Sequence, residues 1–417
     1  MSNYKKDWYG NTPLYWENKK LKYFLSVKNG KEITRELPNS ESSIDVYGSG
    51  GVFKWTDKVL YSGESVLFGR KGTIGKPIFV NGEFWTVDTM YYTVFGNKAY
   101  PKYFFYLMKV FPWDVITTQT ALPSIVGTEV ENFECSVPVY SEQVEIATFL
   151  DIKCNEIKAL IRAKEKMIFL LKEQLQTIIT EAVTKGLNPD VKMKDSGEEC
   201  IGEIPEHWEI KKIKHIAKFV GSGKTPKGGS EIYSEEGIPF LRSLNVHFNG
   251  LRLKDMVYIS SEIDEEMKST RVQPLDILLN ITGASIGRSC IVPQDFGPAN
   301  VNQHVCIIRT IPSIILPELL SNIMSASFII QQILMNQNGS SREGLNFTQV
   351  KNLEFPLPKA IEEQKEITRY ITKKVKEIND LVQDIKQQIE KLKEYRQSLI
   401  YEAVTGKIDV RDFEVVS

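Results

Sequence analysis

The sequence of 417 residues lacks long hydrophobic runs and carries almost no net charge. No apolar stretch approaches the roughly 18–20 residues that a membrane-spanning helix needs, and the opening MSNYKKDWYG has no apolar signal-peptide core. These absences predict a cytoplasmic protein without a membrane partner. Lys and Arg number 52 against 53 Asp and Glu, for a net charge of −1. A DNA-binding domain usually has a basic surplus, so the bulk charge argues mildly against nucleic acid unless basic patches are balanced elsewhere.

Cysteine is scarce and is not arranged for metal binding. There is no C-x-x-C pair among the five cysteines, which we expect to be free thiols in a reducing compartment: Cys135, Cys154, Cys200, Cys290 and Cys306. His304 lies two residues from Cys306, which would place both on one face of a strand. Two candidate ligands do not make a metal site, so structural packing is favoured and no metal is predicted.

A nucleotide-binding P-loop is also missing, although FVGSGKTPKGG (219–229) resembles one. The motif G-x-x-x-x-G-K-[ST] needs a glycine five positions before Gly223, where this chain has Lys218. Pro226 directly follows Thr225 and disfavours the helical conformation that a P-loop threonine adopts. The segment is therefore interpreted as a flexible basic loop.

The most informative feature that is present is an internal duplication with a period of about 200 residues. Four pairs of segments recur in the same order: TPLYWENKKLKYF with IPEHWEIKKIKHI, GRKGTIGKPIFV with ITGASIGRSCIV, VENFECSVPVYSEQVEIATFL with VKNLEFPLPKAIEEQKEITRYI, and QTIITEAVTKGLN with QSLIYEAVTGKID. The stretches between these anchors differ strongly. This pattern indicates two variable heads on one common frame.

The frame consists of two predicted long helices. Residues 142–184 contain neither proline nor glycine, and apolar residues recur there at heptad spacing, as they do in 361–405. Such a pattern is typical of a coiled coil, here predicted to be antiparallel, and about 40 residues would form a rod on the order of 60 Å. Antiparallel packing would place the heads at opposite ends of that rod. The predicted seam comprises Leu150, Ile157, Ile161, Ile168, Leu171, Leu175, Ile371, Ile378, Ile385, Ile389, Leu392 and Leu399.

The heads combine short β-rich runs with turn clusters, so each is predicted to be an α+β domain. Their loops mix Gly, Ser, Thr, Asn, Gln, Lys and Arg, a composition suited to phosphates and base edges. The predicted organisation is a first head in 1–141, a long helix in 142–184, a linker in 185–203, a second head in 204–360, a second long helix in 361–405 and a tail in 406–417.

The order head, long helix, head, long helix resembles the specificity subunit of type I restriction–modification enzymes. The matching words are IGEIPEHWEIKKIKHI, the paired GTIGK and ASIGR turns, LPKAIEEQKEI, and the helix endings EAVTKG and EAVTGK, and they span essentially the whole chain. The resemblance implies two target recognition domains that each read one half of a split double-stranded DNA site, with the coiled coil setting the gap and a pseudo-twofold repeat relating the halves.

The resemblance also implies partners that supply the chemistry. Two modification subunits would bind S-adenosylmethionine and methylate adenine N6, and restriction subunits would use ATP and Mg for translocation and cleavage. This chain itself is expected to bind no cofactor and to have no catalytic residue. It lacks the Asn/Asp-Pro-Pro-aromatic tetrapeptide of an adenine methyltransferase, since NPDV (188–191) has neither the second proline nor the aromatic residue.

The candidate DNA contacts lie partly in the recurring glycine turns and partly in loops that differ between the copies. A solvated turn is the competing interpretation for each of them. They are Arg70, Lys71, Thr73, Lys76, Gln119 and Thr120 in the first head, and Lys224, Lys227, Arg288, Asn338, Ser340, Ser341 and Arg342 in the second. Trp16 and Trp208 recur at equivalent places, which favours a core or docking role over base stacking. An alternative function is a non-enzymatic coiled-coil scaffold whose heads bind protein or small ligands.

Overall fold

The computed structural model describes residues 10, 12–118, 123–226, 228–337, 344–411 and 413. The chain divides into two compact units, one formed by Met1–Glu165 with Lys386–Ser417 and the other by Lys166–Ile385. Each unit therefore combines one head with a section of both long helices, α4 (Tyr140–Lys185) and α10 (Ile361–Val404). These helices occupy the segments where the sequence predicts 142–184 and 361–405. None of the helices in the described residues is long and apolar enough to cross a membrane.

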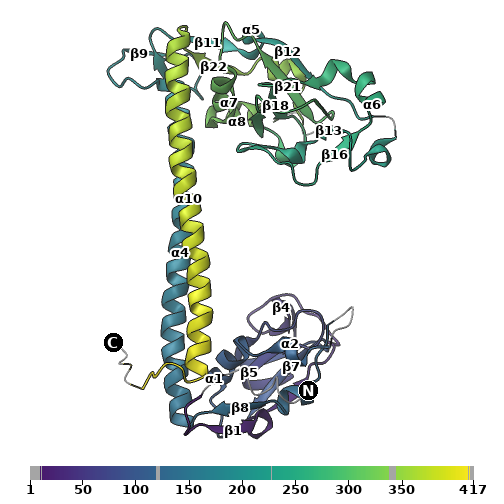
Figure 1. Cartoon of the computed structure of the whole chain (residues 1–417), viewed down its shortest axis with the longest axis vertical. Helices are drawn as coiled ribbons and strands as arrows, with labels where there is room; N and C mark the ends of the chain where they lie inside the picture. The colour runs from purple at the N-terminus through teal and green to yellow at the C-terminus, as the bar shows by residue number, and fades with distance from the viewer. Residues whose placement is uncertain are drawn as a thin grey trace. The chain divides into compact units, whose positions relative to one another are not determined.

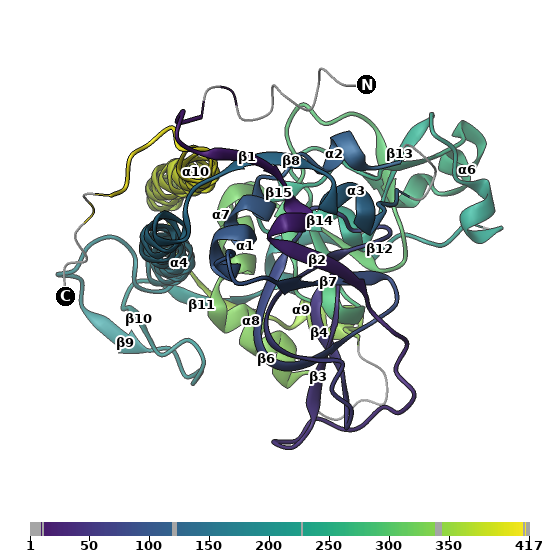
Figure 2. The ribbon, with the colours of Figure 1, turned by 90° about the horizontal axis from the view of Figure 1, so that it is seen from below.

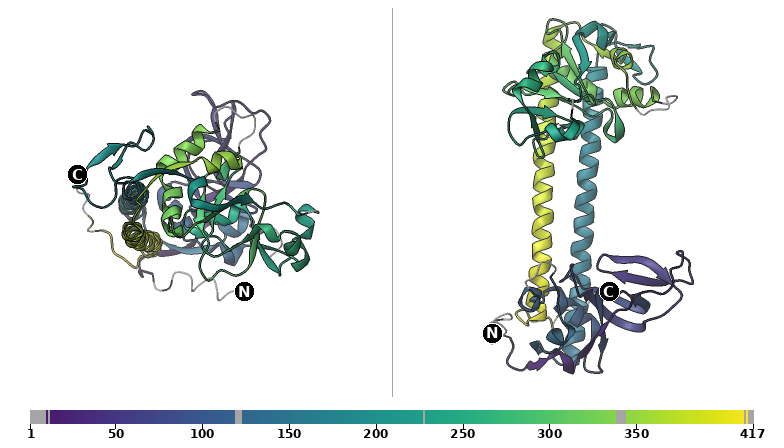
Figure 3. Two further views of the ribbon diagram at one scale, coloured as in Figure 1. Left: turned by 90° about the horizontal axis from the view of Figure 1, so that it is seen from above. Right: turned by 90° about the vertical axis from the view of Figure 1, so that its right-hand side faces the viewer.

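Within each unit the sections of α4 and α10 lie side by side and run antiparallel (Figures 1 and 3). In the first unit Lys164 Nζ donates to Gln388 Oε1 at 2.6 Å. In the second unit Leu175 and Val375 pack against the same hydrophobic core. Of the predicted seam, Leu150, Ile157, Ile161, Ile371, Ile378, Ile385, Ile389 and Leu399 are buried, and Ile168, Leu171, Leu175 and Leu392 are half-buried.

The first head is built on a sheet with the strand order β2-β7-β5-β6-β3-β4, in which β3 and β6 pair in parallel and the other neighbours are antiparallel. Aromatic and β-branched residues favour these strands, and their inward side chains, such as Leu67 and Phe84, are fully buried. The strands are β2 (Leu25–Asn29), β3 (Ile44–Gly48), β4 (Gly51–Thr56), β5 (Tyr61–Gly69), β6 (Ile78–Thr86) and β7 (Met90–Phe95).

Short elements tie this sheet to the long helices of the same unit. Strands β1 (Glu17–Lys20) and β8 (Glu134–Val137) form an antiparallel pair just before α4. Figure 2 shows α1 (Pro101–Lys109) beside α4, where the Tyr106 hydroxyl donates to Asp151 Oδ1 at 2.7 Å. Helices α2 (Trp113–Ile116) and α3 (Gly127–Glu131) complete the head.

The second head has two small sheets. One has the order β12-β21-β18-β19 and is antiparallel throughout, and the other has the order β16-β13-β20-β17 with β13 and β20 parallel. The β13–β20 pair corresponds to the parallel β3–β6 pair of the first head. The strands are β12 (Ala217–Ser222), β13 (Ile238–Leu241), β16 (Val257–Ile259), β17 (Arg271–Val272), β18 (Ile277–Asn280), β19 (Ser289–Ile291), β20 (Ala299–Val301) and β21 (Val305–Thr310).

Further elements of the second unit cover these sheets. Strand β11 (Glu209–Lys212) pairs with β22 (Glu354–Leu357) before α10, as β1 pairs with β8 before α4. A small hairpin joins β14 (Val246–His247) to β15 (Gly250–Leu251). The helices are α5 (Ile213–Ile216), α6 (Ser261–Glu266), α7 (Pro317–Ser325), α8 (Ser327–Met335) and α9 (Phe347–Lys351).

The predicted linker 185–203 is more ordered than its polar composition indicates. It contains β9 (Met193–Asp195), which pairs antiparallel with β10 (Glu203–Pro205). An Asx-type contact from Asp195 Oδ1 to the Gly197 amide at 2.9 Å supports the turn between them. Sequence composition does not indicate this pair, because each strand has only three residues, too few to show a period-2 pattern.

The repeated tryptophans are part of the frame, in agreement with the core or docking role that their recurrence in both copies predicts. Trp16 is 7% exposed and Trp208 is fully buried. Trp16 Nε1 donates to Glu142 Oε1 at 3.1 Å, and Trp208 Nε1 donates to Glu363 Oε1 at 2.9 Å. Each head therefore anchors its first segment to the beginning of the long helix that follows it.

The glycine that follows the other long helix packs against the tryptophan ring in each unit. Gly186 follows α4 with φ +74°, and Gly406 follows α10 with φ +70°, a left-handed conformation that favours glycine after a helix. A Cβ at Gly186 would lie 3.3 Å from Trp208 Cζ2, and one at Gly406 would lie 3.0 Å from Trp16 Cζ2. The two units thus share one architecture, and the predicted α+β class with an internal repeat is confirmed.

Candidate nucleic-acid interface

The first head presents a cationic glycine turn between β5 and β6. Lys71, Thr73 and Lys76 are exposed there, whereas Arg70 is half-buried and its guanidinium lies 5.8 Å from the centre of the Tyr91 ring. No ion pair with another described residue neutralises these cations. The turn closes through Gly75, whose φ of +81° favours glycine. The turn therefore offers free positive charge on a fixed backbone.

A second loop of the first head lies against this turn. Lys71 forms a β-bridge with Ser124, and the Gly72 amide donates to Pro123 O at 3.0 Å. The predicted contacts Gln119 and Thr120 belong to the same loop but lie outside the described residues. Of this loop, the described residues Pro123 and Ser124 contact the glycine turn.

The second head repeats this arrangement at residues 282–288. Gly287 has φ +84°, matching Gly75 of the first head. Thr282 forms a β-bridge with Gly344, which follows the predicted contacts Asn338, Ser340, Ser341 and Arg342. Those four residues lie outside the described part of the chain. Arg288 is half-buried at the end of the turn.

A pocket of about 450 Å³ opens beside this second turn. None of its lining residues is acidic, and most carry a hydroxyl, imidazole or guanidinium group. Of these residues, only Arg288 is predicted from the sequence to be a DNA contact, because the others come from separate segments that only the fold brings together. The lining residues are Ser243, Leu244, Thr282, Gly283, Ala284, Ser285, Arg288 and His304.

The GSGK loop is positioned by a close backbone approach and has no P-loop geometry. Strand β12 ends at Ser222, and a Cβ on Gly223 would lie 1.5 Å from Val301 O. Gly30 of the first head makes the equivalent approach, since a Cβ there would lie 2.0 Å from Val87 O. Lys224 is exposed beyond this glycine, whereas Lys227 lies outside the described residues.

The His304–Cys306 pair does not form a metal site. His304 Nδ1 is hydrogen-bonded to Thr282 Oγ1 at 2.7 Å, and the buried Cys306 thiol contacts Ile307 O. Burial raises the pKa of Cys306 to about 12. Across the described residues no group of three or more His, Cys, Asp or Glu side chains could hold a metal ion.

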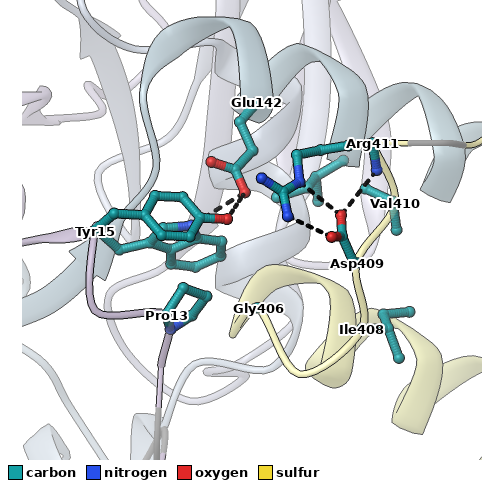
Figure 4. A pocket seen from close by; sticks show the side chains of 10 residues that line it. Pro13, Tyr15, Glu142, Gly406, Ile408, Asp409, Val410 and Arg411 are labelled. Carbon is teal, nitrogen blue, oxygen red and sulfur yellow. Dashed lines mark hydrogen bonds and ion pairs between the residues drawn. The ribbon is translucent and has the colours of Figure 1, made fainter.

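A second pocket, of about 150 Å³, lies in the first unit between the start of α4 and the segment after α10 (Figure 4). Its polar groups satisfy one another: the Tyr15 hydroxyl donates to Glu142 Oε1 at 3.0 Å, and Arg411 Nε donates to Asp409 Oδ1 at 2.8 Å. The Arg411 guanidinium holds the pKa of Asp409 at about 2. This pocket therefore belongs to the frame that anchors Trp16.

Fold and surface together define a duplicated binding protein, in which each of two related heads presents a cationic glycine turn. The chain belongs to the family described as "Type I restriction modification DNA specificity domain", whose sequence model matches residues 13–167 and 205–391. The predicted family is thereby confirmed, and each of its two matches covers one head together with the first part of the long helix that follows.

Individual relatives are similar over much of the chain. The Escherichia coli type I restriction enzyme EcoBI specificity subunit is 27% identical over 65% of this chain and 58% of its own length. The MjaVIII specificity subunit of Methanocaldococcus jannaschii is 25% identical over 71% of this chain and 67% of its own. The matches thus span about three fifths to two thirds of these relatives.

Solved structures share the fold. A chain from a type I restriction–modification system aligns with a TM-score of 0.69 at 13% identity, covering 95% of this chain and all of that one. The HsdS subunit from Thermoanaerobacter tengcongensis aligns with a TM-score of 0.51 at 16% identity, covering 95% and 98%. At these identities the likeness concerns architecture, and residue roles have to be argued from this chain.

Proposed function

We propose that this chain is the sequence-specific DNA-binding subunit of a type I restriction–modification complex. Each head acts as a target recognition domain that reads one half of a bipartite, asymmetric double-stranded site. The observation that carries this proposal is the recurrence of one glycine turn, closed by Gly75 and Gly287, with different neighbouring side chains in the two heads. A common support with unlike reading groups is what two different half-sites require.

The candidate contacts divide by chemistry into backbone and base contacts. The exposed ammonium groups of Lys71, Lys76 and Lys224 suit phosphates, which position a protein on DNA without reading its sequence. Arg70 and Arg288 are half-buried, so their guanidinium groups are held more rigidly and suit base edges. The near-neutral total charge is compatible with this division, because Lys71 and Lys76 form no ion pair with a described residue and the acidic residues that balance the total lie elsewhere.

The long helices are proposed to set the gap between the half-sites. Helix α4 of 46 residues and α10 of 44 residues would each extend about 65–70 Å at 1.5 Å per residue, against about 34 Å for one turn of DNA. Two modification subunits would dock on this frame with S-adenosylmethionine and methylate adenine N6. Restriction subunits would add ATP- and Mg-dependent translocation and cleavage, so this chain contributes recognition and no catalysis.

Co-expression with a cognate modification subunit, followed by genome-wide mapping of N6-methyladenine, tests this function. The expected result is one bipartite motif with two unlike halves and a constant gap. Absence of such a motif, with both proteins folded and the modification subunit binding S-adenosylmethionine, would overturn the proposal. A non-enzymatic scaffold would instead retain its ligand at salt concentrations that release DNA, because phosphate-based binding weakens steeply with salt.

A further inference from the structure

The pocket of the second head is held together by one buried amide. Asn280, at the end of β18, is fully buried. Its Nδ2 donates to Ser243 O at 2.8 Å and to Ser285 Oγ at 3.1 Å. Its backbone amide donates to Arg288 O at 2.8 Å. Asn280 therefore fixes three separate parts of the pocket wall relative to one another.

The same amide has an unused acceptor. Asn280 Oδ1 is buried and has no hydrogen-bond partner among the described residues, and the same is true of Arg242 Nε, next to the wall residue Ser243. A buried polar atom without a partner is unfavourable, and native proteins rarely leave such an acceptor without a ligand or water. Asn280, which carries this unused acceptor, is also the residue that holds the Ser243 and Ser285 segments of the pocket wall in place.

Unlike most of the described arginines of the second head, Arg288 has no partner for its guanidinium among the described residues. Arg309 is bound to Asp276, with Nε at 2.7 Å from Oδ1, and Arg271 is bound to Asp264 and Glu265. No described residue forms a hydrogen bond or ion pair with the Arg288 guanidinium. Because the pocket has no carboxylate in its lining, the guanidinium keeps all its donors for an incoming acceptor.

We propose that Arg288 reads one guanine of the half-site bound by the second head, using the pocket built on Asn280. The proposal rests on the proposed DNA-recognition function. The planar guanidinium donates two parallel hydrogen bonds to the O6 and N7 acceptors of guanine in the major groove, a pairing that no other base offers. Ser285 and the Thr282–His304 pair are fixed donors and acceptors for the adjacent base. Arg288 is thus a specificity-determining residue.

Three variants of the full chain, each co-expressed with the modification subunit, test this assignment by mapping N6-methyladenine. R288K keeps the charge but loses the bidentate fork, and R288Q loses both. R252Q is the matched control, because Arg252 is an arginine of the same head that is exposed and lies outside the pocket. We expect R288K and R288Q to lose the preference for guanine at one position of one half-site, a preference of roughly 5- to 150-fold in wild type.

The other half of the motif and the gap are expected to stay unchanged in all variants, and R252Q is expected to give the wild-type motif. Loss of a whole half-site would indicate an unfolded head, so the unfolding midpoints of R288K and wild type are compared, and equal midpoints are required. A wild-type motif in R288K with uniformly weaker methylation in R288Q would mean a phosphate contact and would overturn base reading. A half-site without guanine would overturn it too. No bipartite motif in wild type would instead overturn the function on which it rests.

Discussion

Replacing Trp208 with alanine separates a structural from a DNA-stacking role of the repeated tryptophans. The Trp208 side chain is fully buried, its Nε1 donates to Glu363 Oε1 at 2.9 Å, and its ring lies against Gly186. Truncation would remove a large buried ring and leave a cavity, which costs about 3–5 kcal/mol. The second unit should therefore lose roughly 6–20 °C in unfolding midpoint, at about 2–4 °C per kcal/mol for a unit of this size.

A graded series makes the reasoning sharper. W208F keeps most of the buried apolar area but loses the N–H donor to a carboxylate, which is worth about 1.5–3 kcal/mol. The lower end is expected, because Glu363 also contacts His207 Nε2 at 3.1 Å and its side chain is 28% exposed. The predicted order of destabilisation is W208A, then W208F, with the matched control F248A near zero, since Phe248 is 49% exposed at the β14–β15 hairpin.

Differential scanning calorimetry of the purified chain, combined with amide hydrogen exchange to assign each transition to a unit, measures these shifts. The first unit should keep its stability in all three variants. An unchanged midpoint in W208A together with a DNA affinity lowered by an amount typical of a lost base stack, about 1–3 kcal/mol, would refute the structural role.

Three further predictions follow from described contacts. The double variant K71Q/K76Q should weaken DNA binding and reduce the slope of log K against log salt by roughly 1.8, as measured by fluorescence anisotropy. The control K54Q should leave the slope unchanged, because Lys54 is already paired with Glu36. An unchanged slope in K71Q/K76Q would show that the turn is not part of the DNA interface. G223A should disrupt the second head, because its Cβ would lie 1.5 Å from Val301 O, whereas the control G297A should be neutral because open space surrounds Gly297. Equal unfolding midpoints of G223A and wild type would contradict the close approach. Cys290 and Cys306 should resist iodoacetamide at pH 8.5 in the native protein, because burial raises the pKa of each thiol to about 12. The stability that these protonated thiols contribute should be lost as the pH rises from about 8.5 toward 12. Rapid labelling of the native protein, detected by mass spectrometry, would count against this burial.

The repeat and the long helices could be predicted from the sequence because their signals are periodic and local. Heptad spacing places Leu150 and Ile157 on one face, and both are buried. The duplicated turn motifs GTIGK and ASIGR likewise predict equivalent backbone conformations, which Gly75 and Gly287 adopt. These features depend on short stretches of chain, where physical preferences are strongest.

The pocket of the second head could not be predicted, because its walls come from segments far apart in the sequence. Ser243, Arg288 and His304 meet only after β13, β18 and β21 have formed their sheets. The spacing of His304 from Cys306 raises the question of a metal ligand, but the hydrogen-bond partner of His304 is Thr282, 22 positions away. The β9–β10 pair could not be predicted either, because its strands have three residues each and are joined only by the fold.

Exchange of one head tests the central claim most directly. The second head, residues 204–360, would be replaced by the corresponding segment of a family member that methylates a known, different motif, and N6-methyladenine would be mapped across the genome with the same modification subunit. We predict that one half of the bipartite motif changes to that of the donor, while the other half and the gap stay as in wild type. Both halves changing together, or neither changing in a folded and active complex, would contradict the claim that each head reads its own half-site.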